Sequence, residues 1–189
     1  LIREADLSTS RVRTIVGTGR QGYDRRGGRN GTAQEIASPW DVAVDGNRLF
    51  IAMAGTHQIW VTDLASGKTS QFSGNGRENI VDGPPDRANF AQPSGLALID
   101  GTLYVADSEV SGLRAVNTSN GSVTTIAGRG LFVFGDVDGA GDSVRLQHAL
   151  GLAVQGDRLL LADTYNHKIK QVIPATREVK TLYGTGNPG

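Results

Sequence analysis

The stretch with the clearest chemical potential is the acidic segment DVDGAGD, residues 136–142. The carboxylates of Asp136, Asp138 and Asp142 are spaced like the opening of a calcium loop, and calcium prefers oxygen ligands. An EF-hand loop also requires a bidentate Glu at its twelfth position, and counting from Asp136 reaches Gln147 instead. These aspartates are therefore candidate metal ligands, but a tight acidic turn is the favoured interpretation.

The three histidines offer a second possible metal site. His57 and His167 occupy matching positions of an internal repeat, and His148 is the first residue of its third copy. Two or three imidazoles on one face could ligate zinc. Repetition argues against such a site, because equivalent positions are spread around a repeat structure, whereas zinc needs at least three convergent ligands. We expect these histidines to anchor turns, and we expect no cofactor.

These residues belong to a chain that repeats itself three times, at residues 38–76, 92–130 and 148–186. Each copy contains four short apolar or alternating segments separated by turn residues, which predicts four β-strands. Four strands at this period are typical of a propeller blade. The spacing of 54 and then 56 residues is illustrated by one alanine from each copy: Ala52, Ala106 and Ala162.

The repeat predicts an all-β fold in which residues 1–189 form one propeller segment. We expect blades at about residues 38–74, 92–128 and 148–184, preceded by one outer strand at residues 11–17. Asp107 and Asp163 end the second strand of their copies. We expect both to accept hydrogen bonds from the amides of the turn that follows.

Composition excludes several classes of function. The 189 residues include 26 glycines, as expected for many tight turns, and no cysteine, which rules out disulfides, thiolate zinc sites and thiol redox chemistry. Nineteen basic residues balance nineteen acidic ones, so no overall charge favours nucleic acid or an anionic membrane. No apolar run approaches the roughly 20 residues that span a bilayer. The compartment stays open, with the cytoplasm favoured.

The segment ADTYNHKIKQV resembles an NHL repeat, in which Asn166 and His167 match the first two letters of the name and Ile169 resembles the third. LFVFGDVDGAGDSVRLQHALGLA and VADSEVSGLRAV are similar to the propeller of the thioredoxin-like proteins that carry NHL repeats. In that family a thioredoxin-like domain precedes a six-bladed propeller. The resemblance therefore implies half of a six-bladed ring, without the thioredoxin-like domain and its redox activity.

Three blades cannot close a ring, because propellers have about four to eight. A head-to-tail homodimer would supply six blades and cover the open apolar faces. The leading strand at residues 11–17 would be surplus in such a ring. That surplus favours a piece of a longer chain or an exchange of strands, and the alternatives stay open.

The turns between second and third strands and the loops between blades are expected to emerge on one face, where propeller sites usually lie. Asp41 stands where the other copies have Gly95 and Gly151, so a carboxylate beside an indole could mark a ligand at the channel mouth. A solvated aspartate is the simpler explanation. The candidate binding residues on this face and at the channel mouth are Trp40, Asp41, His57, His148, Asn166, His167, Arg25 and Arg26, with Arg29 nearby.

The favoured function is non-catalytic binding, most simply of a protein partner, because variable loops stand on a regular frame. No catalytic residues are predicted, since no nucleophile elbow or HExxH motif occurs. One alternative is a propeller enzyme with an axial metal, similar to lyases or lactonases. Another is an RNA-binding NHL propeller that uses YDRRGGRNG, residues 23–31, although Arg without clustered aromatics on a neutral chain is more typical of a solvated loop.

Overall fold

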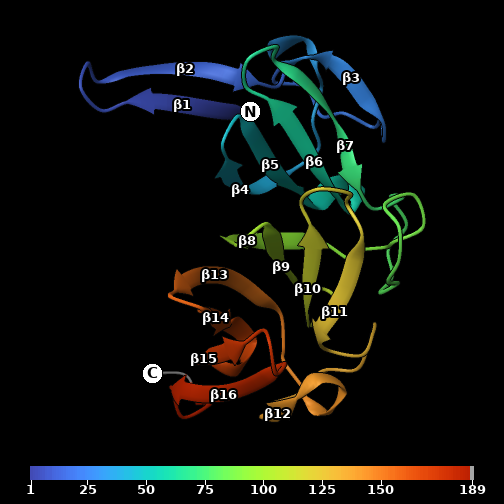
Figure 1. Ribbon diagram of the computed structural model, residues 1–189, viewed down its shortest axis with the longest axis vertical. Coiled ribbons are helices and arrows are strands. Elements are labelled where there is room, and N and C mark those ends of the chain that lie inside the picture. Colours follow the sequence, from blue (N-terminus) through green and yellow to red (C-terminus); the bar gives the residue numbers. More distant parts are fainter. Residues whose placement is uncertain (188–189) are drawn as a thin grey trace.

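The computed structural model describes residues 1–187 and consists almost entirely of antiparallel β-sheet. Three sheets follow one another around an arc, with β4 (Pro39–Asp45), β8 (Pro93–Ile99) and β13 (Ala149–Gln155) on its inner side and β3 (Gly27–Asn30), β11 (Val123–Ala127) and β12 (Gly139–Ala140) on its outer side (Figure 1). This arrangement is an open segment of a β-propeller, as the repeat predicted. In the part of the chain that the structure describes, no helix is long and apolar enough to cross a membrane.

Each blade is a four-stranded meander that runs from the inner to the outer side. The first blade contains β4 (Pro39–Asp45), β5 (Arg48–Met53), β6 (Gln58–Asp63) and β7 (Lys68–Ser73). The second contains β8 (Pro93–Ile99), β9 (Thr102–Asp107), β10 (Gly112–Asn117) and β11 (Val123–Ala127). The third contains β13 (Ala149–Gln155), β14 (Arg158–Asp163), β15 (Lys168–Ile173) and β16 (Glu178–Tyr183).

The loops between blades run along the outer edge of the propeller before they return to the inner strand. In the first blade β3 (Gly27–Asn30) pairs with β7, and in the third blade β12 (Gly139–Ala140) pairs with β16, so each loop supplies a short fifth strand. The sequence placed these loops on one face of the disc. They begin and end there, but their middle parts line the rim.

Three apolar clusters hold the blades together. Between the first and second blades, Ala88 and Phe90 of the connecting loop pack against strand residues such as Phe50, and these three side chains are fully buried. Val144 and Leu146 fill the equivalent position between the second and third blades. The two loops therefore carry an apolar pair at the same repeat positions, and each pair packs between neighbouring blades. Truncating a buried Phe of this kind to Ala costs about 3–5 kcal/mol.

The chain begins with more structure than the sequence predicted. The expected outer strand is present as β2 (Arg11–Val16), but β1 (Ile2–Asp6) pairs with it to make a two-stranded hairpin. The buried side chains of Ile2 and Val16 pack in one cluster with residues of β5 and β6, which attaches this hairpin to the first blade. In Figure 1 the hairpin projects from that blade, with its turn farthest from the arc.

Candidate binding face

One side of the propeller, here called the loop face, carries most of the residues selected from the sequence. It consists of the turns between second and third strands, at residues 54–57, 108–111 and 164–167, together with the first residues of β4, β8 and β13. These features share a side because the strands are antiparallel: Pro39 at the start of β4 lies opposite Met53 at the end of β5.

Asp41 joins two blades at the inner end of this face. One of its carboxylate oxygens accepts a hydrogen bond of 2.8 Å from the backbone N–H of Leu96 in β8, and the other accepts one from Val42. The equivalent Gly95 approaches the third blade so closely that a Cβ there would lie 2.5 Å from the carbonyl oxygen of Leu150. The Asp41 carboxylate thus links the inner strands of the first and second blades. Between the second and third blades, Gly95 lets the inner strands contact each other directly. Trp40 beside it is 52% exposed.

Turn residues make a repeated bond from one blade to the next. The Nδ1 atom of His57 accepts a hydrogen bond of 3.1 Å from the backbone N–H of Gln92. The hydroxyl of Ser111, at the same repeat position, accepts one of 3.3 Å from the backbone N–H of His148. Both turn residues have positive φ angles, a conformation in which the turn can present a side chain to the neighbouring blade. Burial lowers the pKa of His57, which keeps the ring neutral at pH 7.

A polar and aromatic cluster crosses the boundary between the second and third blades. The rings of His148 and Tyr165 are stacked, with centroids 4.4 Å apart and planes inclined by 11°. The Nε2 atom of His148 lies 3.5 Å from a carboxylate oxygen of Glu109. Nδ1 of the same ring is buried without a hydrogen-bond partner among the described residues. Tyr165 is 57% exposed, so the cluster presents an aromatic surface to solvent.

Of these three residues, His148 was expected at a binding site from the sequence, and Glu109 and Tyr165 were not. Glu109 and Tyr165 occupy equivalent positions in two consecutive repeats, each in the turn between the second and third strands. This equivalence is the signal that could have identified them. The two other candidate residues of the turn at residues 164–167 differ in solvent exposure. Asn166 is buried and donates hydrogen bonds to the carbonyl oxygen of Gly135 and to a carboxylate oxygen of Asp163, whereas His167 is exposed.

The basic segment near residue 25 is divided between two locations. The backbone carbonyl oxygen of Arg25 accepts a hydrogen bond of 3.1 Å from the side chain of Gln58, which holds this loop against the first blade near the loop face. Arg26 is exposed next to it, but Arg29 lies in β3 on the outer edge. The three guanidinium groups therefore do not form one compact patch around the channel.

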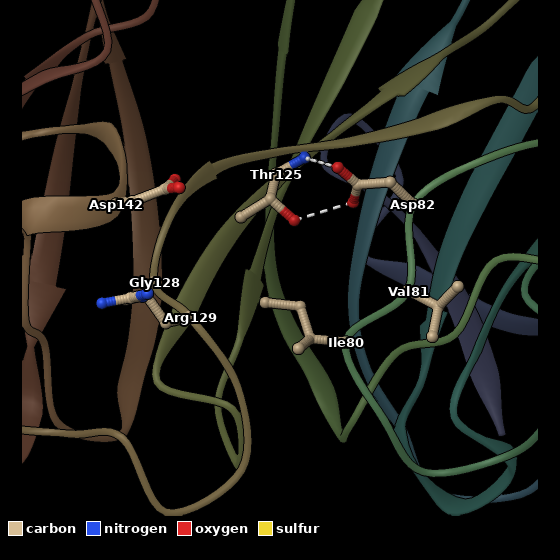
Figure 2. Close-up of a pocket in the computed structure, with 7 residues that line it drawn as sticks. All are labelled: Ile80, Val81, Asp82, Thr125, Gly128, Arg129 and Asp142. Carbon is tan, nitrogen blue, oxygen red and sulfur yellow. Dashed lines mark hydrogen bonds between the residues drawn. The ribbon is translucent and has the colours of Figure 1, made fainter.

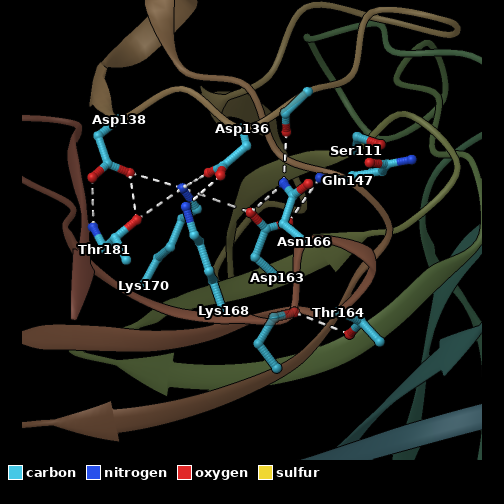
Figure 3. Close-up of polar contacts among 12 residues, drawn as sticks. Ser111, Asp136, Asp138, Gln147, Asp163, Thr164, Asn166, Lys168, Lys170 and Thr181 are labelled. Carbon is cyan, nitrogen blue, oxygen red and sulfur yellow. Dashed lines mark hydrogen bonds and ion pairs between the residues drawn. The ribbon is translucent and has the colours of Figure 1, made fainter. Parts of the chain in front are cut away.

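Lysine side chains of the third blade form ion pairs with carboxylates of the acidic loop, residues 136–142 (Figure 3). Asp136 pairs with Lys168 and, at 2.8 Å, with Lys170. Asp138 pairs with Lys170 at 2.7 Å and accepts a hydrogen bond of 2.8 Å from the backbone N–H of Thr181. Hydrogen bonds from Lys168 and Lys170 lower the pKa of Asp136. Asp138 has a lowered pKa because its hydrogen bonds, first that from Lys170, outweigh its burial.

The third carboxylate of the loop points elsewhere. Asp142 pairs with Arg177 at 2.9 Å, so the three aspartates do not converge. Among residues 1–187, no group of three or more acidic, histidine or cysteine side chains is arranged to hold a metal ion. Of the three aspartates of the loop, only Asp136 and Asp138 contact the fully buried amine of Lys170, whose pKa rises because its bonds to these two carboxylates outweigh burial.

The second blade contains the same arrangement around a buried arginine. Arg114 uses all five of its N–H donors: it bonds Asp107 at 3.0 Å and Asp82 at 2.9 Å, and its other bonds reach the Thr125 hydroxyl and the carbonyl oxygens of Asn89 and Val81. Arg114 and Asp107 are both fully buried. Burial raises the pKa of Asp107 to about 6, against the pull of Arg114.

Asp107 and Asp163 differ from expectation in their backbone partners. Asp107 accepts a hydrogen bond of 2.7 Å from the amide of Ala91, and Asp163 one of 2.7 Å from the amide of Gln147. Both amides belong to the incoming loop and not to the turn that follows the strand. The expectation was wrong because the loop before the inner strand passes directly over the end of the second strand, which the sequence pattern does not reveal.

The first blade replaces this ionic arrangement with apolar contact. Met53 stands at the position of Asp107, and Trp60 at the position of Arg114, and both are buried. The indole N–H of Trp60 donates a hydrogen bond of 3.0 Å to Gln58. Both charges are absent together, which avoids the cost of a lone buried charge.

A pocket of about 420 Å³ lies on the rim between the second and third blades (Figure 2). Asp82 on one side is bonded to Thr125, while Asp142 faces it from the loop of the next blade. Because both carboxylates are already paired with arginines, this pocket offers few unused polar groups. Its lining residues are Ile80, Val81, Asp82, Thr125, Gly128, Arg129 and Asp142.

Comparisons with known proteins agree with this architecture. The family model described as NHL repeat matches residues 37–61. The chain is 45% identical over 200 aligned positions to Protein SUPPRESSOR OF QUENCHING 1, chloroplastic, of Arabidopsis thaliana, covering 100% of this chain and 19% of that protein. It is 45% identical over 218 positions to NHL repeat-containing protein 2 of Homo sapiens, covering 99% of this chain and 30% of that protein.

The chain thus spans less than a third of the length of these relatives. Among solved structures, an auxiliary nutrient binding protein from Bacteroides ovatus superposes with a TM-score of 0.67 over 96% of this chain and 43% of that one. Sequence identity in that comparison is 18%, so the likeness concerns the fold alone.

Proposed function

Because this chain is an NHL-repeat β-propeller segment, we propose that it is a non-catalytic binding module whose loop face contacts a protein partner. The observation that carries the proposal is the exposed aromatic surface of that face. Tyr165 is held rigidly against His148 across a blade boundary, and Trp40 is half-exposed at the inner edge. Tyrosine and tryptophan are enriched among the residues that contribute most to protein binding.

The polar groups of the same face support binding over catalysis. The carboxylate of Asp41 bridges two strands, and Nδ1 of His57 accepts a backbone hydrogen bond. The carboxylates of the acidic loop are paired with lysines and an arginine. A catalytic base or metal ligand must be able to reach substrate or metal, and these groups are already bonded to other groups of the protein.

The test is a quantitative capture experiment with the intact chain and two variants. Proteins retained by the wild type but lost with the double variant Trp40→Ala and Tyr165→Ala are candidate partners, and their dissociation constants are then measured with purified material. Leu64→Ala is the matched control, because Leu64 is also exposed but lies in a turn on the opposite side of the blade. We expect the double variant to weaken binding at least about tenfold, which corresponds to 1.4 kcal/mol.

Equal binding by the wild type and the double variant, or loss of binding with Leu64→Ala alone, would refute the assignment of the loop face. The RNA-binding alternative has its own readout. A salt-dependent gel shift that disappears with Arg25→Ala and Arg26→Ala would replace the protein partner with RNA.

A further inference from the structure

The loop that joins the second blade to the third, which follows β11 in Figure 1, is longer than the loop before it. Its fixed ends are Gly130 and Gly135, five positions apart, whereas the equivalent Gly76 and Asn79 are three positions apart. Asn79 and Gly135 are equivalent because the backbone N–H of each donates a hydrogen bond, of 3.3 and 3.0 Å, to the second residue of the buried apolar pair in its own loop. The two added residues account for the lengthening of the repeat from 54 to 56 residues.

The longer loop also carries apolar side chains where the other two loops carry polar ones. Between the fixed ends, residues 20–21 are Arg-Gln and residues 77–78 are Arg-Glu, whereas residues 131–134 are LFVF, here called the apolar tip. Phe132 is 88% exposed and Phe134 is 56% exposed. Residues 77–78 are also exposed, although a further blade follows theirs. Exposure is therefore a property of this loop position and not of an uncovered blade face.

The backbone of the apolar tip holds Phe132 outward in an unfavourable conformation. The N–H of Val133 donates a hydrogen bond of 3.2 Å to the carbonyl oxygen of Gly130, which closes a turn with Phe132 as its third residue. Phe132 has a φ of 66°, a region that glycine and asparagine favour and bulky side chains rarely adopt. Burial of the ring does not offset this strain, because the ring is exposed. Backbone strain of this kind clusters at functional sites.

The apolar tip lies at the same blade boundary as the aromatic surface of the loop face. Gly128, just before the tip, is so close to the turn at residues 108–111 that a Cβ there would lie 3.0 Å from a carbonyl oxygen of that turn. Just after the tip, the carbonyl oxygen of Gly135 accepts a hydrogen bond of 2.6 Å from the side chain of Asn166, in the turn at residues 164–167. These two turns carry Glu109 and Tyr165. One partner can therefore cover the apolar tip and the Tyr165 ring together.

The charges near the apolar tip favour a protein over a lipid surface. Anionic bilayers bind exposed apolar segments that have clusters of basic side chains beside them. Arg129 is exposed just before the tip, but Lys168 on the other side is already paired with Asp136. The carboxylate of Glu109 is 34% exposed, and among residues 1–187 its ion-pair partner is the imidazole of His148 and not a lysine or arginine. Such a carboxylate suits a protein surface that offers a basic side chain.

We propose that Phe132 inserts into an apolar pocket of a protein partner, and that a lysine or arginine at the mouth of that pocket faces Glu109. Phe134 and Tyr165 pack around the mouth. An aromatic anchor in a desolvated pocket supplies much of the affinity of an interface, while charged groups at the rim fix its orientation. This contact rests on the proposed function and adds to it the anchor residue and the chemistry of the partner's site.

A photo-cross-linker at the anchor position identifies what receives it. The phenylalanine analogue p-benzoyl-phenylalanine replaces Phe132 in one preparation of the intact chain and Tyr23 in a second, and both are irradiated in cell extract. Tyr23 is the matched control, because it is an aromatic residue of the first loop and is 81% exposed. Position 132 should yield a cross-linked protein that position 23 does not yield. Mass spectrometry should place the cross-link on an apolar residue of that protein.

Dissociation constants of the purified cross-linked protein and variants of the chain then test each part of the contact. Phe132→Asn removes the ring and keeps a residue that tolerates positive φ, so it should weaken binding at least about tenfold. The same variant should leave the unfolding midpoint unchanged or raise it by about 2 °C, because strain is relieved. Phe132→Trp and Tyr23→Asn should each stay within about threefold of the wild type. Glu109→Lys should weaken binding, and reversal of the basic residue on the partner to Glu should restore it.

Several results would overturn the proposal. They are cross-linking at position 132 no greater than at position 23, cross-links to this chain or a second copy of it, and binding that Phe132→Asn leaves unchanged. Sedimentation with vesicles of phosphatidylcholine and phosphatidylserine that requires Phe132 would assign the apolar tip to a membrane instead. A clear fall in the unfolding midpoint of Phe132→Asn would mean that the ring serves stability. Loss of binding in the double variant Trp40→Ala and Tyr165→Ala, but not in Phe132→Asn, would leave the proposed function intact and remove this anchor from it.

Discussion

Arg114→Met should destabilise the protein strongly, because it removes the cation from a fully buried carboxylate. The guanidinium makes five hydrogen bonds, and neither it nor the Asp107 side chain is exposed. Breaking a buried pair from one side costs about 3–5 kcal/mol. The lower end, about 3 kcal/mol, is expected here. Burial already raises the pKa of Asp107 to about 6, so that carboxyl can take up a proton when the arginine is lost.

The first blade shows how the loss can be compensated. It carries Met53 and Trp60 at these positions, with both charges absent. The double variant Asp107→Met with Arg114→Met should therefore be less destabilised than the sum of the single variants, with a coupling energy of about 1–3 kcal/mol. Urea denaturation of the wild type, both single variants and the double variant measures this cycle.

The pH dependence of the single variant supplies a second check. A carboxyl whose pKa is raised in the folded state binds protons more tightly there, so its protonation stabilises the fold as pH falls through that pKa. Because Arg114 lowers the pKa of Asp107, its removal places that pKa above the value of about 6, and Arg114→Met should regain stability as pH falls from there toward the unfolded value of about 4. Additive single-variant effects, or a loss below about 1 kcal/mol for Arg114→Met, would refute the view that this pair is a buried, coupled unit.

Three further predictions concern other parts of the fold. Asp41→Ala should lower the free energy of unfolding by about 1–2 kcal/mol in a urea titration, because the amide of Leu96 loses its acceptor, and an unchanged midpoint would exclude the bridge. Asp136→Asn should reduce the loss of folding stability at low pH. The lowered pKa of Asp136 gives stability that is present above about pH 4 and lost as pH falls, and the variant lacks this contribution. The same loss of stability at low pH in wild type and variant would contradict the pairing with Lys168. Phe90→Ala should cost about 3–5 kcal/mol by thermal or urea unfolding, while a cost near zero would mean that the loop does not wedge between blades.

Much of the frame could be predicted because each blade has the same local pattern. Alternating apolar segments and turn glycines predict strands, and the repeat spacing aligns Phe90 with Leu146, both of which are fully buried. β1 was missed because IREAD contains only one buried side chain, Ile2, and four exposed ones. A strand with so little apolar pattern is recognised only through its register with β2.

The candidate site was harder to predict because its side chains meet across blades. The repeat spacing carried a usable signal for the ionic sites: Arg114 with Asp82 recurs as Lys170 with Asp138, both shifted by 56 residues. The cluster of Glu109, His148 and Tyr165 had a weaker signal, namely the equivalent turn positions of Glu109 and Tyr165 in consecutive repeats. Its members come from consecutive blades and depend on how the blades pack, which local periodicity does not specify.

The most direct test of the proposed binding role is hydrogen exchange of the chain with and without its captured partner. Binding through the loop face should slow exchange in residues 38–41, 108–111 and 164–167, with little change at the opposite turns, residues 64–67 and 117–122. Slowed exchange confined to the opposite turns, or no change on either side at saturating partner, would contradict the assignment of this face.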